Sequence, residues 1–224
     1  DEISRIFRTC YEWEISSRFD YMRILIEVRQ GRAPAEVFKL VAEAEEAAAK
    51  KDDQGAKDKF EQARIIAPNF GYPLFALGKY HARVNDPFRA INAFQRAYQL
   101  DSLYFSAYRE CYILYRRQGS YKPCVEVLTL AIQRGNDYWE MNYKLGEALK
   151  GDADYARAIQ SFEHALAISP RNYQTNIQLG LAFQEMKNYP KARDFFNKAL
   201  DIDSQRQDAV DYLQKLMELQ RGGK

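Results

Sequence analysis

A pattern of 34 residues occurs twice in succession between Trp139 and Arg206, and it constrains the fold more than any other feature of the sequence. Counted from Trp139 and again from Tyr173, small residues stand at places 8, 20 and 27, and a phenylalanine stands at place 24. With place 32 added, the two copies read Gly146, Ala158, Phe162, Ala165 and Pro170, then Gly180, Ala192, Phe196, Ala199 and Ser204. A fixed period of this length predicts a stack of similar supersecondary units.

The same spacing continues upstream without insertion, in three further copies that start at Val37, Gly71 and Phe105. The matching places there hold Ala44, Ala56, Phe60, Ala63 and Pro68, then Gly78, Ala90, Phe94, Ala97 and Ser102, then Tyr112, Cys124, Leu128, Ala131 and Asn136. Small residues let the two helices of a hairpin approach closely, and a phenylalanine ring is expected to fill the seam between one hairpin and the next. We therefore expect each copy to be a hairpin of two helices, A and B, of about 14 residues each, joined by a short polar turn.

This spacing resembles the tetratricopeptide repeat, a helix–turn–helix unit that stacks into a solenoid. The resemblance implies an all-α fold in which the hairpins form a right-handed superhelix with a concave face. On this frame the repeats are residues 37–70, 71–104, 105–138, 139–172 and 173–206. We expect residues 1–36 to form a divergent helical hairpin, residues 207–221 a capping helix and residues 222–224 a tail.

Two segments depart from the repeat pattern. In repeat 105–138, Tyr112 replaces the usual small residue in a tyrosine-rich stretch, which predicts either a repacked hairpin or an aromatic platform. Near the N-terminus, the stretch Tyr21–Val28 is apolar almost all round, so we expect it to be buried on more than one side, by its own hairpin or by another molecule.

The sequence contains no pattern that indicates an enzyme, a cofactor site or a metal site. Phosphate-loop, nucleophile-elbow and paired-histidine metal motifs are all missing. His81 is expected to be packed in the interior and His164 to lie on the surface or in a seam. Cys111 and Cys124 are expected to be buried thiols, with a disulfide between them as the lesser alternative.

Composition leaves the compartment open. The net charge of +2 is too small to indicate nucleic acid binding by itself, and three cysteines without a regular spacing favour neither cytoplasm nor periplasm. The longest apolar run near the N-terminus is too short to span a membrane. Because the sequence begins at Asp1 rather than Met, we expect it to be a fragment or a processed form.

The resemblance implies a binding surface on helices A, chiefly at places 2, 5, 6, 9, 12 and 13 of each repeat. These places are basic and aromatic in the middle of the chain, amide-rich in repeat 173–206 and acidic in the last helix. Such a surface suits a peptide or helix with acidic residues and apolar anchors. The predicted contact residues are Tyr72, Phe75, Lys79, Arg83, Arg109, Arg116, Tyr143 and Lys144.

We therefore expect a non-catalytic scaffold or adaptor that binds another protein in a concave groove. A chaperone-tail clamp is disfavoured, because no repeat has the lysine and asparagine pair at places 5 and 9 that such a clamp uses. Two alternatives remain: a structural subunit docked through the apolar N-terminal hairpin, and, with less support, a binder of single-stranded RNA.

Overall fold

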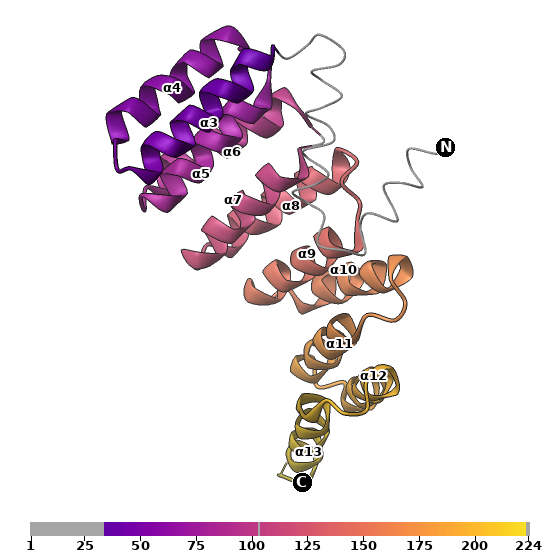
Figure 1. Cartoon of the computed structure of the whole chain (residues 1–224). Helices are drawn as coiled ribbons and strands as arrows, with labels where there is room; N and C mark the ends of the chain where they lie inside the picture. Colours follow the sequence, from indigo (N-terminus) through magenta and orange to yellow (C-terminus); the bar gives the residue numbers. More distant parts are fainter. Residues whose placement is uncertain (1–33, 103, 223–224) are drawn as a thin grey trace. The chain divides into compact units, whose positions relative to one another are not determined.

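The computed structural model describes residues 34–102 and 104–222 of the chain (Figure 1). These residues form eleven helices and no strand, so the expected all-α fold is confirmed for them. The helices are α3 (Ala35–Ala49), α4 (Asp53–Ile66), α5 (Gly71–Arg83), α6 (Pro87–Leu100), α7 (Phe105–Arg117), α8 (Tyr121–Gln133), α9 (Trp139–Gly151), α10 (Tyr155–Ile168), α11 (Tyr173–Glu185), α12 (Tyr189–Ile202) and α13 (Gln207–Gly222). No described helix combines the length and the apolarity that crossing a membrane requires.

Helix starts recur with the period found in the sequence. Helices α5, α7, α9 and α11 begin at Gly71, Phe105, Trp139 and Tyr173, which are spaced by 34 residues. The division of the chain into repeats, a cap and a tail stays a prediction that this recurrence supports. The N-terminal hairpin and its stretch Tyr21–Val28 lie outside the described residues.

The chain divides into two compact parts, which we call the N-terminal block (Asp1–Leu114) and the C-terminal block (Tyr115–Lys224). Within the N-terminal block, α3 packs on α4 and on α5, and α5 packs on α6. Within the C-terminal block, α9 packs on α8 and α10, α11 on α10 and α12, and α13 on α12. The two blocks are described separately below.

The turn between two helices of a hairpin uses a left-handed residue followed by a capping residue. In the hairpin α9–α10, Ala153 has φ 61° and Asp154 follows it. The N–H of Asp154 donates to the carbonyl of Leu149 at 2.8 Å, which ends α9, and the Asp154 carboxylate accepts from the N–H of Arg157 at 3.1 Å, which caps α10. Positive φ angles recur at the equivalent places, namely Lys51, Asn85, Gly119 and Lys187.

Because only glycine adopts this conformation without strain, we expect Ala153→Gly to raise the free energy of unfolding by about 1 kcal/mol. Exposed Ala156 provides the control, since it lies inside α10 with ordinary helical geometry. Ala156→Gly should lower the same free energy by up to about 1 kcal/mol. Urea denaturation followed by circular dichroism measures both values. Two changes of the same sign would contradict this account of the turn.

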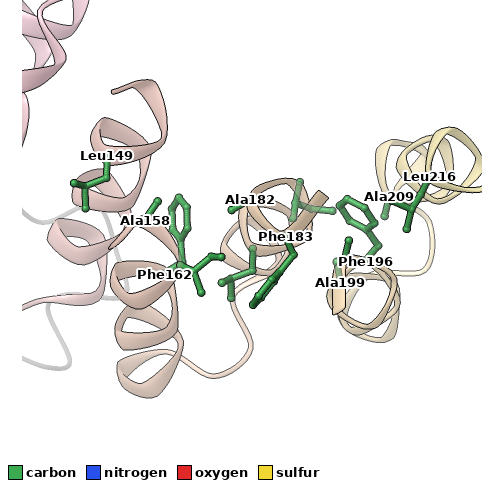
Figure 2. Close-up of a cluster of buried hydrophobic side chains, with 13 residues drawn as sticks. Leu149, Ala158, Phe162, Ala182, Phe183, Phe196, Ala199, Ala209 and Leu216 are labelled. Atoms are coloured by element: carbon green, nitrogen blue, oxygen red, sulfur yellow. The ribbon is translucent and has the colours of Figure 1, made fainter. Parts of the chain in front are cut away.

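Three of the described hairpins, α5–α6, α9–α10 and α11–α12, close around one ring and one glycine. A Cβ placed on Gly78 would lie 2.6 Å from the Phe94 ring, and one on Gly146 would lie 2.5 Å from the Phe162 ring. The same overlap occurs between Gly180 and Phe196. All three rings are fully buried, and the close-up in Figure 2 shows Phe162 and Phe196 in the core of the C-terminal block. The expected role of the small residue at place 8 is therefore confirmed in these hairpins, whereas the ring at place 24, expected between hairpins, lies against the glycine of its own hairpin.

We expect Gly180→Ala to lower the free energy of unfolding by about 1–3 kcal/mol, because its methyl group would overlap the Phe196 ring. The double change Gly180→Ala with Phe196→Leu should be less destabilising than the sum of its two single changes, because the smaller side chain makes room for the methyl group. Urea denaturation of the four proteins measures this coupling. Additive losses would show that ring and glycine do not constrain each other.

The tyrosines that departed from the repeat pattern belong to the core. Tyr108 and Tyr112 are fully buried, and the rings of Tyr98 and Tyr108 stack with centroids 4.2 Å apart. The Tyr108 hydroxyl donates to the carbonyl of Ser102 at 3.1 Å. The repacked hairpin, rather than an aromatic platform, therefore describes these two residues.

The last helix is buried on one face only. In α13, Ala209 and Leu216 are fully buried against α12, whereas Met217 is 43% exposed. Gln220 accepts a hydrogen bond from Arg193 of α12 at 2.8 Å. This one-sided burial fits the predicted capping role of the helix.

Candidate partner-binding surface

The eight residues predicted to contact a partner lie on three helices. Five belong to the N-terminal block and three to the C-terminal block, so each set is described within its own block. The first set is Tyr72, Phe75, Lys79 and Arg83 on α5 and Arg109 on α7; the second is Arg116 at the end of α7 and Tyr143 and Lys144 on α9.

Four of these residues share one face of α5. Tyr72, Phe75, Lys79 and Arg83 follow one another at intervals of three or four residues, which places them along one side of a helix. We call them the α5 stripe. The two aromatic residues are half-buried, and the two cations are exposed. The stripe therefore offers apolar contact at its N-terminal end and positive charge at its C-terminal end.

Aromatic neighbours hold the N-terminal end of the stripe. Tyr72 stacks on Phe38 of α3, with ring centroids 5.4 Å apart, and Phe70 lies 5.8 Å from Phe38 and 6.1 Å from Tyr72. Burial raises the pKa of the Tyr72 phenol, and the charge of Glu45 raises it further. The phenol therefore stays neutral. We call Phe38, Phe70 and Tyr72 the aromatic cluster.

Phe75 and Lys79 form the middle of the stripe. The Phe75 ring lies 5.5 Å from the Phe94 ring and 5.0 Å from the Tyr104 ring, so its position is fixed from the side of α6. The Lys79 ammonium lies 5.9 Å from the centroid of Phe75. A cation over an aromatic face gains about 0.5–1 kcal/mol at an exposed site. This contact orients Lys79 without cancelling its charge.

Arg83 ends the stripe in a similar way. Its guanidinium carbon lies 5.9 Å from the centroid of Tyr80, whose hydroxyl donates to Asp53 at 2.8 Å. Burial and this hydrogen bond raise the pKa of Tyr80 to about 12. Within the described part of the chain, neither Lys79 nor Arg83 forms an ion pair with a carboxylate. Both charges are therefore available to another molecule.

Arg109 is different, because the chain itself supplies its counter-charge. Its guanidinium pairs with the Glu110 carboxylate at 3.2 Å, and the side chain is 34% exposed. Its Nε is buried and has no hydrogen-bond partner among the described residues. The positive charge expected at this place from the sequence is therefore largely offset.

Lys144 and Tyr143, two of the predicted residues of the C-terminal block, also have partners within the chain. Lys144 pairs with Glu140 at 3.3 Å and is 19% exposed. The Tyr143 hydroxyl donates to Glu147 at 3.4 Å, and burial is the main reason that its pKa rises to about 12. Arg116 is exposed, and its charge lowers the pKa of Cys124 against the stronger effect of burial, which raises that pKa to about 11.

Sequence reasoning missed two features of these surfaces. Phe38 belongs to the aromatic cluster, and the signal for it was present, since it has place 2 of its repeat just as Tyr72 does. On the C-terminal block, Lys150 of α9 donates to the Gln178 side chain of α11. Burial lowers the pKa of this lysine, although Glu147 and Glu185 oppose that effect.

The described thiols are buried and not joined to each other, so the disulfide alternative is wrong. Cys111 and Cys124 are fully buried and form no disulfide. Burial raises the pKa of the Cys111 thiol well above its ordinary range. His81 is buried, as expected, and His164 is exposed with its Nε2 3.2 Å from Asp137, which places it on the surface as expected. Among the described residues, no cluster of histidine, cysteine and carboxylate side chains could hold a metal ion.

Buried His81 makes the N-terminal block sensitive to acid. Burial lowers its pKa, Asp86 opposes this effect, and Arg89 and Lys57 add to it. Since the unfolded chain keeps a histidine pKa near about 6.5, acid protonates the unfolded state first, and stability falls as the pH drops below that value.

We therefore expect the melting temperature of the wild-type chain to fall between pH 7 and pH 5 by more than that of His81→Gln, whose side chain does not titrate. Thermal melts at several pH values, monitored by circular dichroism, give the two slopes. Parallel slopes would show that the His81 pKa is the same in the folded and unfolded states.

Comparison with known proteins gives a match to one family model and a fold. The family model for the tetratricopeptide repeat matches residues 140–205. A UDP-N-acetylglucosamine–peptide N-acetylglucosaminyltransferase of Giardia intestinalis is 25% identical over 130 residues, which are 57% of this chain but only 9% of that enzyme. This chain therefore corresponds to a small part of that relative.

Solved structures with the same fold share little sequence with this chain. The crystal structure of MamA matches with a TM-score of 0.63 and 22% identity, covering 77% of this chain and 94% of MamA. YrrB, described as a repeat protein with an unusual peptide-binding site, matches with a TM-score of 0.61 and 19% identity, covering 72% of this chain and 84% of YrrB. At these identities the matches establish the α-solenoid fold class and leave the binding properties to be argued from the residues.

Proposed function

We propose that this chain is a member of the tetratricopeptide-repeat family and a non-catalytic scaffold that holds a segment of a partner protein on the α5 stripe. Solenoids of this family present large surfaces built from successive helices, and such surfaces serve as platforms for other proteins. YrrB, which has the same fold, is described as having a peptide-binding site. The proposal for this chain rests on its own residues.

The observation that carries the proposal is the difference between two kinds of cation. Arg109 and Lys144 already pair with Glu110 and Glu140. Lys79 and Arg83 instead lie over aromatic rings, are exposed and have no ion pair within the described chain. Aromatic area beside an uncompensated cation favours a partner that combines apolar anchors with carboxylates.

The other predicted contacts have secondary roles in this proposal. Arg109 and Lys144 would have to exchange an internal partner for an external one, which gains little free energy. Tyr143 and exposed Arg116 can add contact area on the C-terminal block. We assign them to the edge of the binding surface and place its centre on α5.

The non-catalytic part of the proposal is supported by the state of the reactive groups. A nucleophilic cysteine needs an accessible thiolate, whereas burial keeps Cys111 and Cys124 protonated. The relative from Giardia is a glycosyltransferase by name, but this chain aligns with 9% of it. We therefore propose no transferase activity here.

Reversing both free charges tests the site. We expect the double change Lys79→Glu with Arg83→Glu to reduce capture of partner proteins from a lysate of the source organism by about tenfold or more, because acidic segments would then be repelled. Quantitative mass spectrometry of the proteins retained by wild-type and variant chains measures the loss.

The matched control is Lys57→Glu with Arg96→Glu, which makes the same charge change on exposed residues of α4 and α6 in the same block. This control should retain the partners that the wild-type chain retains. Equal retention by all three proteins would remove the α5 stripe as the binding site. Equal loss in both variants would show a general effect of charge instead of a local one.

A further inference from the structure

One side of α13 is more exposed than the same side of another helix A. Places 4, 7 and 11 of α13 hold Val210, Leu213 and Met217, which lie along one side of the helix. In α11, Phe183 at place 11 is 6% exposed, because it packs on α12 and stacks at 5.5 Å on a phenylalanine ring there. Met217 at the same place of α13 is 43% exposed. We call Val210, Leu213 and Met217 the open face of α13.

The shape of the open face favours an occupant with large side chains. Helix α13 packs on α12 through another side, which holds Ala209 and Leu216 next to Phe196 (Figure 2). Beside the open face, place 8 of α13 is Gln214, where α5, α9 and α11 have a glycine. An occupant therefore cannot approach α13 as closely as α12 approaches α11. Long aliphatic side chains on the occupant would fill the wider gap.

Carboxylates line one edge of the open face. Asp211 and Glu218 are exposed, seven residues apart, and form no ion pair within the described part of the chain. Asp211 accepts a hydrogen bond from the neutral amide of Gln207 at 2.9 Å. Lys215, between the two carboxylates in the chain, lies further round the helix from the open face. Basic residues on the occupant would therefore match this edge in charge.

The chain itself contains a stretch of that composition, among the 33 residues that precede the described part. Tyr21–Val28 is apolar except for Arg23 and Glu27. From Arg18 to Arg29 there are three arginines against two acidic residues. Because the stretch is apolar almost all round, it requires burial on more than one side.

Helix α3 does not offer this stretch an apolar surface. In α5, places 3 and 10 hold Pro73 and Tyr80, which are buried, and the Tyr80 hydroxyl donates to Asp53 of the preceding hairpin at 2.8 Å. That side of a helix A therefore faces the hairpin before it. In α3 the same places hold Lys39 and Glu46, which are exposed and form ion pairs along α3 itself. A hairpin stacked on α3 in the regular way would bury these charges at a cost in free energy.

We infer that Tyr21–Val28 of one copy binds the open face of α13 in a second copy of this chain. The six residues 29–34 join the stretch to α3 of its own chain and span at most about 20 Å, which keeps it near its own N-terminal block. A second copy has no such restriction. Pairing of two open faces is less favourable, because it would bring the carboxylates of both copies together. The α5 stripe takes no part, so this inference goes beyond the proposed function and does not depend on it.

Such a contact joins copies head to tail. The stretch and the open face are different surfaces, so each copy that binds one neighbour leaves a surface for the next, and the assembly stays open-ended. Sedimentation velocity of the whole chain should therefore show an average size that keeps rising with protein concentration.

Two variants that each block one surface test the contact. We expect Leu25→Glu in the stretch, or Met217→Glu on the open face, to raise the concentration needed for association by about tenfold or more. Met217 is exposed, so its variant should remain folded, which circular dichroism checks. An equimolar mixture of the two variants should form dimers and nothing larger, because only one intact stretch and one intact open face can meet.

Leu219→Glu is the matched control for the open face. Leu219 is 42% exposed and two residues from Met217, which places it about 200° round the same helix. This variant adds the same charge to α13 on the opposite side. It should associate as the wild-type chain does.

Charge reversal identifies the stretch as the occupant. The double change Asp211→Arg with Glu218→Arg should weaken association by about tenfold, because the edge of the open face would repel arginines. Adding Arg23→Glu and Arg29→Glu to the same chain should restore association, since both charges of the contact are then exchanged. A segment of any other composition would gain nothing from the second pair of changes.

Several results would overturn this inference. One is a wild-type chain that stays monomeric at every concentration, or that stops at dimers. Another is a mixture of the Leu25→Glu and Met217→Glu variants that remains monomeric. Equal loss of association in Leu219→Glu would show unspecific apolar contact, and a chain with all four charge changes that does not associate would exclude the stretch as occupant.

Discussion

One contact, a phenylalanine ring against a glycine, sets the distance between the helices of a hairpin in both blocks. Gly78 receives Phe94, and Gly146 receives Phe162, with no room for a Cβ. Helix A packs on helix B through the face that carries its glycine. The opposite face of helix A is therefore left for other contacts. On α5 this leaves Lys79, next to Gly78 in the chain, exposed to solvent. The core contact thus determines which residues the proposed binding surface can use.

The uncompensated charge at that surface depends on whether each cation lies beside a carboxylate or beside an aromatic ring of the same chain. Arg109 lies beside Glu110, and Lys144 lies one turn after Glu140, so each forms an internal ion pair. Lys79 and Arg83 find aromatic rings instead, which hold their positions and leave their charges uncompensated. The net charge of +2 hides this difference, because it sums over residues that are already neutralised. Binding specificity depends on the remaining uncompensated charges.

The fold was predictable from the sequence because its signal is repeated, whereas the site was predictable only in part. Places 8 and 24 recur in register, so the close approach at Gly180 was predictable, whereas the contact of the Phe196 ring with that glycine was not, because the ring was expected between hairpins. The pairing of Lys144 with Glu140 was equally open to sequence reasoning, since residues four apart on a helix are neighbours. The hydrogen bond that Lys150 donates to Gln178 could not be predicted, because it depends on how side chains of two different helices extend toward each other.

The principal helix pairings of the described chain join neighbours or next neighbours in sequence, such as α3 with α4 and α5, or α9 with α10 and α11. Contacts of such short sequence separation cost little loop-closure entropy, so folding can start at more than one hairpin and spread along the chain. Damage should be equally local: a chain that loses α12 can keep the hairpin α3–α4, because no principal pairing links them. Unfolding of such a molecule is better described by a series of nearest-neighbour couplings than by a single all-or-none transition.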